Sequence, residues 1–394
     1  GIHYVFNPGE ISPTSPTSGI NFLQLDQKRA VEGGIYIGAD HKINDRLSLQ
    51  YGLRYTHFAR LGGQPITEYL NDQPVVYNEL LEIYQRGTPI GQTEYARSEV
   101  IDDFGTLEPR LALSYRLNDF TSIKAGYSRV AQYIHLLSNT TSVTPLDVWT
   151  PSGPYVEPQL SDQFAVGFFK KFNNEYSLEV EGYYKNIYDR IDYIDGSDLI
   201  GNNTIETEIL TGDARAYGIE FLARKSAGRF TGWLAYTLSR SEQQTPGGNS
   251  GGPGINEGKT YLTPFDRTHD LSFTGVFRLN KKWNLSTNVI YQTGRPVTYP
   301  NGQYVYEGLS IASYSDRNSD RLPAYHRIDV SAIYTPGKPG RRWRGDWVFG
   351  IYNIYNRRNA AAISFSQNRE TGLNEATRIA IFGIVPSITY NFKF

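Results

Sequence analysis

The segment FDRTHD, residues 265–270, groups side chains that could transfer protons. A histidine next to carboxylates is a common acid–base arrangement, and here His269 lies close to Asp266 and Asp270, with Arg267 beside them. Hydrolytic chemistry would also need a nucleophile with supporting geometry. No serine is placed for that role, and cysteine is absent. The sequence therefore indicates a protein that is not an enzyme.

The sequence also contains candidates for phosphate and metal binding. The segment GGPGINEGKT (251–260) resembles a phosphate-binding loop, but Pro253 occupies a position where that motif requires glycine. No histidine has a second ligand at metal-binding spacing. The acidic segments 98–103 and 188–198 supply oxygen ligands for Ca²⁺, although neither follows the pattern of an EF-hand loop. We therefore expect no required cofactor, with Ca²⁺ in a loop as the one candidate ion.

Composition narrows the class of protein. Lys and Arg number 39 against 40 Asp and Glu, and the basic residues are scattered, so the sequence does not indicate nucleic-acid binding. Cysteine is absent, which excludes disulfides and thiolate chemistry in this chain. No apolar run is long enough for a transmembrane helix. The mean hydropathy of −0.46 is typical of a soluble protein, yet a water-filled barrel would score as low because only alternate residues meet lipid.

Alternating side chains predict strands along the chain. The segment YSLEVEGYYK (176–185) separates at every second position into two sets, which is typical of a strand because successive side chains point to opposite faces. One set is apolar (Tyr176, Leu178, Val180, Gly182, Tyr184) and the other carries Glu179, Glu181 and Lys185. The pattern recurs at 46–58, 109–116, 163–171, 283–292 and 387–394. Only 77–85 has helical spacing, so the sequence predicts an all-β chain.

The connections between these strands alternate in length. Short turns are expected near 42–45, 117–119, 172–174, 226–229, 280–282 and 336–342, and long polar segments at 61–105, 132–158, 189–213, 242–265 and 296–325. A soluble sandwich or propeller gives no reason for long loops at one end only. A transmembrane antiparallel β-barrel does, with short periplasmic turns and long extracellular loops. We expect about fourteen strands, beginning with residues 1–6.

Several segments in order resemble one family. The segments 145–199, 261–300 and 321–337, and the ending GIVPSITYNFKF, are similar to TonB-dependent outer-membrane receptors, especially those of Bacteroidetes-type bacteria. The resemblance implies a 22-stranded barrel filled by an N-terminal plug. Residues 1–394 would then be the C-terminal portion of one outer-membrane barrel domain, with the plug and the first strands absent from this chain. In such receptors the block 265–270 enters a strand from an outside loop, so ion pairing at the barrel rim is expected there.

The resemblance implies uptake of a scarce, bulky nutrient of the siderophore, glycan, peptide or cobalamin class, driven by the TonB energy complex through the missing N-terminal part. Two alternatives remain open: a receptor-fold scaffold subunit of a larger outer-membrane complex, and a complete fourteen-stranded passive channel. Further expected partners are outer-membrane lipid and lipopolysaccharide, the barrel-assembly machinery and a surface lipoprotein.

Three groups of residues are expected to carry these roles. Polar side chains on the lumen face would hold the plug and line the path: Arg54, Glu179, Glu181 and Lys185. Loop aromatics could stack on a ligand, although loop packing explains any one of them equally well: Trp149, Tyr155, Tyr193, Tyr299 and Tyr304. The apolar stripe of the last strand would be read by the barrel-assembly machinery: Ile388, Tyr390, Phe392 and Phe394.

Overall fold

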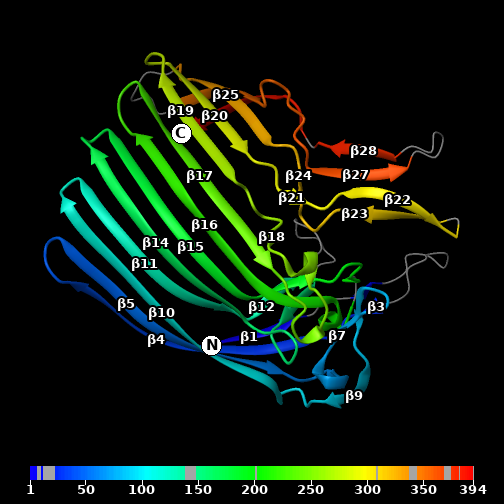
Figure 1. Ribbon diagram of the computed structural model, residues 1–394. Coiled ribbons are helices and arrows are strands. Elements are labelled where there is room, and N and C mark those ends of the chain that lie inside the picture. The colour runs from blue at the N-terminus through cyan, green and yellow to red at the C-terminus, as the bar shows by residue number, and fades with distance from the viewer. Residues whose placement is uncertain are drawn as a thin grey trace.

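A computed structural model describes residues 1–6, 10–11, 23–137, 148–199, 202–307, 309–336, 344–367, 374–380 and 382–393. Its main feature is one curved antiparallel sheet in which fourteen strands follow one another in sequence order (Figure 1). They are β1 (Ile2–Phe6), β4 (Lys28–Lys42), β5 (Leu47–Leu61), β10 (Val100–Asn118), β11 (Thr121–Gln132), β14 (Gln159–Phe172), β15 (Tyr176–Tyr193), β16 (Ile209–Lys225), β17 (Phe230–Gln244), β19 (His269–Arg278), β20 (Trp283–Gln292), β25 (Tyr325–Tyr334), β26 (Arg344–Tyr352) and β29 (Val385–Lys393). A short strand, β18 (Tyr261–Leu262), also pairs with β17.

Tight turns join the described strands at one end of the sheet, as the sequence predicts, while the turn predicted at 336–342 lies outside the described residues from 337 onward. Asparagine closes several of them: the Asn44 side chain accepts hydrogen bonds from the backbone N–H groups of Arg46 and Leu47, and Asn280 does the same for Lys282 and Trp283. Such side-chain contacts mimic a backbone turn. They therefore end one strand and begin the next within a few residues.

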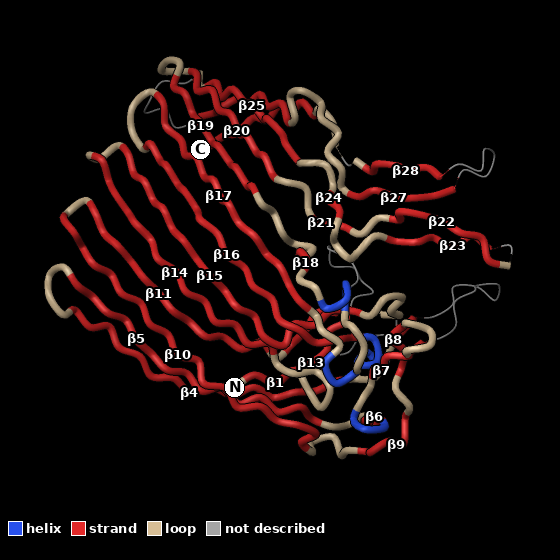
Figure 2. Tube along the Cα trace, in the orientation of Figure 1, coloured by secondary structure: helices blue, strands red, loops and turns tan. Residues whose placement is uncertain are grey.

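The opposite end carries the long connections, which form hairpins and short 3₁₀ turns (Figure 2). The hairpins are β2 (Glu10–Ile11) with β3 (Leu23–Gln24), β6 (Pro65–Tyr69) with β9 (Pro89–Glu94), β7 (Val75–Asn78) with β8 (Ile83–Arg86), β12 (Ile134–Leu137) with β13 (Val148–Pro151), β21 (Pro296–Val297) with β24 (Asp320–Arg321), β22 (Pro300–Tyr306) with β23 (Leu309–Tyr314), and β27 (Ala362–Gln367) with β28 (Asn374–Ile379). The 3₁₀ turns are η1 (Leu70–Asp72), η2 (Ile205–Glu208), η3 (Gly248–Ser250) and η4 (Ile255–Gly258).

The helical spacing at 77–85 does not produce a helix. The segment is the tip of the β7–β8 hairpin, where the Asn78 side chain accepts hydrogen bonds from the backbone N–H groups of Leu80 and Leu81. Glu82 adopts a φ of 54°, which a helix does not allow. Within the described ranges, no helix is long and apolar enough to cross a membrane.

The strand register places apolar side chains together on the outer face of the sheet. Tyr55 lies opposite Leu107, and Phe164 opposite Tyr184. These side chains remain exposed: Val166, in the middle of β14, is 59% exposed. A soluble sandwich would bury such a face between two sheets, whereas a membrane barrel turns it to lipid.

Buried apolar clusters instead lie where the loop ends of strands meet the loops. One cluster joins Val75, Ile194, Leu210, Ile255 and Tyr261, which come from β7, the β15–β16 region, η4 and β18. In a second cluster, the Phe58 ring stacks on Tyr133 at a centroid distance of 4.8 Å and covers Ala30. The loops are therefore packed against the ends of the strands and have a fixed arrangement there.

The two outermost strands each have one partner among the described residues. β1 pairs with β4, and β29 pairs with β26, while no pairing between β1 and β29 is found within those residues. The far edge of each strand therefore presents backbone N–H and C=O groups that the rest of the described sheet does not satisfy.

Candidate functional site

A cavity of about 670 Å³ lies among the loops at the loop end of the sheet. One wall of the cavity contains a β-bulge in β15. The pairing of β15 with β16 shifts between Ile187 and Arg190, and Asp189 has a φ of 56°. One extra residue reverses the alternation. Even-numbered residues of β15 therefore face outward up to Tyr188, while Arg190 and Asp192 turn toward the interior and line the cavity.

Asp192 is the centre of a hydrogen-bonded network in this wall. Its carboxylate accepts a hydrogen bond from the Gln243 side-chain amide at 2.7 Å and another from the Tyr261 hydroxyl. The Arg190 guanidinium donates to the Gln243 side-chain oxygen at 3.0 Å. Burial and the Asp192 carboxylate raise the pKa of Tyr261, so that its hydroxyl stays protonated and donates.

Arg317, between β23 and β24, connects this network to a distant loop. Its guanidinium donates to Asp192 at 2.9 Å, and also to Asp195 and the backbone carbonyl of Tyr193. Burial lowers the pKa of Arg317, but Asp192 and Asp195 outweigh that effect and raise it. The Asn256 side chain makes hydrogen bonds to both the N–H and the carbonyl of Arg317. Three loops are thus fixed around one cavity.

His135 also lies in the lining of the cavity. Its Nε2 is 3.0 Å from the Ser152 hydroxyl oxygen and its Nδ1 is 3.1 Å from the Gln159 amide nitrogen. Burial lowers its pKa to about 4, so the imidazole is neutral near pH 7. Both ring nitrogens thus have partners, and the neutral ring holds in place Gln159, which also lines the cavity.

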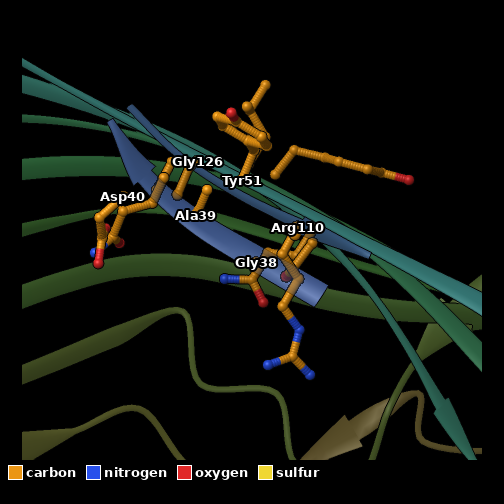
Figure 3. Close-up of a pocket in the computed structure, with 14 residues that line it drawn as sticks. Gly38, Ala39, Asp40, Tyr51, Arg110 and Gly126 are labelled. Atoms are coloured by element: carbon orange, nitrogen blue, oxygen red, sulfur yellow. The ribbon is translucent and has the colours of Figure 1, made fainter. Parts of the chain in front are cut away.

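A second hollow, of about 560 Å³, lies on the sheet itself (Figure 3). Small residues from neighbouring strands form its inner floor: Gly38, Gly52, Ala112, Gly126 and Ala165. Figure 3 shows Asp40 and Arg110 on the side that faces the rest of the curved sheet, and Tyr51 on the other. Another backbone could therefore approach this part of the inner wall closely, with polar groups beside it.

Comparison with known proteins decides the family. The model of the TonB dependent receptor-like β-barrel family matches residues 1–354. The chain belongs to the TonB-dependent receptor family. It is an outer-membrane protein, and fourteen of the described strands follow one another in one antiparallel sheet, in the order that the sequence predicts. No curated protein matches the receptor chain.

Solved structures share the fold of the receptor chain at low sequence identity. They include the siderophore receptor PiuA from Acinetobacter baumannii (TM-score 0.56, 13% identity, covering 93% of this chain and 43% of that one) and the ferric preacinetobactin receptor BauA from the same organism (0.55, 15%, 96% and 45%). The unliganded ferric citrate transporter FecA is similar (0.55, 13%, 96% and 48%). The chain thus spans less than half of each structure. The assignment to Bacteroidetes-type receptors stays a prediction.

The residues predicted to line the receptor lumen all lie on the inner face. Arg54 donates to the Thr56 hydroxyl at 2.9 Å and lies 3.6 Å from the Glu32 carboxylate. Glu179, Glu181 and Lys185 are partly exposed along β15, away from the apolar stripe. Their contact with a plug or a substrate stays a prediction.

The predicted loop aromatics do not form one surface. Tyr193 lines the cavity. The Tyr155 ring packs edge-on against Tyr69 at 5.4 Å, and Tyr299 packs against Phe365 at 5.1 Å, so loop packing accounts for both. Trp149 and Tyr304 are 48% and 56% exposed, and neither lines the cavity. The cavity residues that sequence reasoning missed, Arg190, Gln243 and Arg317, have no local motif that marks them.

The remaining predicted groups are placed as follows. Asp266 is fully buried and pairs with Arg321, which is the ion pairing expected at the rim, while the His269 ring is hydrogen-bonded to the Tyr236 hydroxyl. In the part of the chain that the structure describes, no three His, Cys, Asp or Glu side chains gather as a metal site, and Ca²⁺ stays a prediction. Ile388, Tyr390 and Phe392 are exposed on the outer face, and Phe394 lies outside the described residues.

Proposed function

We propose that this chain forms the C-terminal barrel wall of a receptor that takes up a scarce, bulky nutrient of the siderophore, glycan, peptide or cobalamin class. The loop-end cavity carries the proposal. Its volume of about 670 Å³ suits a ligand larger than common metabolites, and its polar groups are already held by hydrogen bonds. A preorganised site loses less conformational entropy when the ligand binds.

Iron chelates are the first ligands to test. The names of the solved structures with this fold specify a siderophore receptor, a ferric preacinetobactin receptor and a ferric citrate transporter. The cavity offers Arg190 and Arg317 beside Asp192 and Asp195, so its charges are balanced. A polar chelate with several hydrogen-bonding groups fits that balance better than a densely charged anion does.

The inner wall supports an interaction with a plug that links the receptor to the TonB energy complex. The hollow floored by Gly38, Gly52 and Gly126 would accept another backbone, and Asp40 and Arg110 would pair with its polar groups. The edges of β1 and β29 that have no partner among the described residues support a larger barrel, because lipid cannot satisfy free backbone groups. Recognition of the last strand by the barrel-assembly machinery, and contacts with lipopolysaccharide and a surface lipoprotein, belong to the same proposal.

The test is growth when one nutrient is limiting, beginning with iron. The full-length gene is expressed in a bacterium that lacks its own receptors for these nutrients, with and without an intact TonB energy complex, and an iron chelate, a glycan, a peptide or cobalamin is supplied as the only source of the limiting nutrient. We expect growth on at least one nutrient, only where the energy complex is intact. Growth without the complex would instead show a passive channel. A correctly inserted protein that supports uptake of no nutrient in the panel would favour the scaffold alternative.

A further inference from the structure

The outer face of β15–β26 contains two apolar grooves beside the turn between β16 and β17. The first, of about 570 Å³, runs over Ala223 and Gly232, between Leu178 on one side and Leu234 on the other. The second, of about 450 Å³, runs over Gly275 and Thr287, toward Phe349. All these residues lie on the lipid-facing side of the sheet by register.

Small residues in one row across the strands produce these grooves. Gly232, Gly275 and Thr287 lie opposite one another in β17, β19 and β20, where the two neighbouring rows carry large side chains. Ala223 in β16 and Ala332 in β25 belong to those neighbouring rows and extend the grooves on either side. The rings of Phe230 and Phe273 stack across Gly275 at a centroid distance of 6.5 Å. This aromatic pair separates the row into two grooves that lie side by side.

Cationic side chains lie at the turn end of both grooves. The Lys225 ammonium lies 4.0 Å from the centroid of the Tyr176 ring and 2.7 Å from its hydroxyl oxygen. Arg229 lies 5.5 Å from the centroid of the Phe277 ring, which borders the second groove. Glu175 contacts Lys225 at 3.2 Å, but the turn from Arg224 to Arg229 contains no acidic residue. The aromatic rings thus hold two cations at the membrane boundary, where they can meet an anionic headgroup.

The geometry points to a binding site for one anionic glycerophospholipid on the outer wall, with one acyl chain in each groove and the phosphate between Lys225 and Arg229. The site lies at the turn end of the strands, which in this family is the periplasmic side. Two grooves match the two acyl chains, and the net positive charge of Lys225 and Arg229 beside Glu175 matches the single negative charge of a phosphate that no headgroup cation neutralises. The site does not depend on which nutrient the receptor takes up.

Three double variants of the full-length protein test the site. Lys225→Gln with Arg229→Gln removes the two cations. Arg224→Gln with Arg278→Gln is the matched control, because it removes the same charge at the same end of the sheet from residues on the inner face. Ala223→Leu with Ala332→Leu fills both grooves without a change of charge.

Native mass spectrometry of delipidated protein then measures the dissociation constant of the first phosphatidylglycerol or phosphatidylcholine bound. We expect tighter binding of phosphatidylglycerol. Removal of Lys225 and Arg229 should weaken it about twenty-fivefold, since each cation near an anionic lipid contributes roughly fivefold. The control variant, Arg224→Gln with Arg278→Gln, should change the dissociation constant for phosphatidylglycerol less than about twofold, since those side chains face the lumen. Filling the grooves should weaken binding of both lipids.

Three results would overturn the site. They are equal affinity for the two lipids, equal weakening by the two charge-removing pairs, or no effect of the groove-filling pair. Insertion of each variant is checked by the mobility difference between heated and unheated protein on a gel. If a double variant does not insert, the single replacements Lys225→Gln and Ala223→Leu are judged by the same criteria. Lys225→Gln alone should weaken binding of phosphatidylglycerol about fivefold.

Discussion

Replacement of Asp192 by Asn should loosen the loop that carries Arg317. The Asp192 side chain is 12% exposed, and its carboxylate accepts hydrogen bonds from Gln243, Tyr261 and Arg317. The replacement keeps the size of the side chain but removes the charge that pairs with a guanidinium that is itself 19% exposed. Hydrogen bonds to charged groups contribute about 2 kcal/mol each, so we expect a loss of that order in the free energy that holds the loop closed.

Hydrogen exchange followed by mass spectrometry measures this loss directly. A destabilisation of about 2 kcal/mol corresponds to roughly thirtyfold faster exchange of the amides that open with the loop. We expect this acceleration in peptides covering 314–322 and 254–262, because Asn256 and Asn318 connect Arg317 and its neighbour to that second segment.

Asp195 provides a matched control. Its carboxylate also contacts Arg317, but it is 93% exposed, so water screens the pair and Asp195→Asn should cost less than about 1 kcal/mol. Equal acceleration in the two variants would refute the reasoning that burial sets the strength of the contact. Unchanged exchange in Asp192→Asn would show that the network does not hold the loop.

Three further variants or conditions test other parts of the structure. The hairpin of β12 and β13 should lose protection from hydrogen exchange as the pH falls from about 6.5 toward 4. In this range the histidine binds a proton in the unfolded form, whereas buried His135, with its pKa of about 4, stays neutral in the folded form. Protection that does not change with pH, after correction for intrinsic exchange rates, would contradict this. Phe58→Ala should destabilise the protein to guanidinium by about 3 kcal/mol, whereas Phe164→Ala, which is 53% exposed on the outer face, should cost less; equal costs would refute the loop-end core. Val180→Lys should lower the free energy of folding into lipid vesicles by about 3 kcal/mol, while Glu181→Lys should not lower it because Glu181 lies opposite Glu220. The reverse order would mean that Glu181 faces lipid and Val180 faces the interior.

The alternation of β15 could be predicted from sequence because it depends only on neighbouring residues. Leu178 and Val180 fall on the outer face and Glu179 and Glu181 on the inner face, as their order along the chain requires. The bulge before Arg190 could not be predicted, because one extra residue reverses the faces without a distinctive motif. Beyond the bulge, β15 continues to Tyr193, within the segment 189–213 that the sequence predicts as a loop.

The composition of the cavity could not be predicted because its contacts join distant parts of the chain. Arg317 meets Asp192 across 125 positions. Residue type alone also does not separate a ligand-facing aromatic from one used in packing: Tyr193 lines the cavity, whereas Tyr155 packs on Tyr69. Such differences depend on how the loops fold over one another.

The central claim is that this sheet separates lipid from a water-filled interior. Residues 1–394 contain no cysteine, so single spin labels can be placed at 178, 179, 180 and 181 in the full-length protein in lipid vesicles after replacement of any cysteine outside these residues. Labels at Leu178 and Val180 should collide preferentially with oxygen dissolved in lipid, and labels at Glu179 and Glu181 with a water-soluble nickel complex. Accessibility that does not alternate, or that alternates in the opposite sense, would contradict the account.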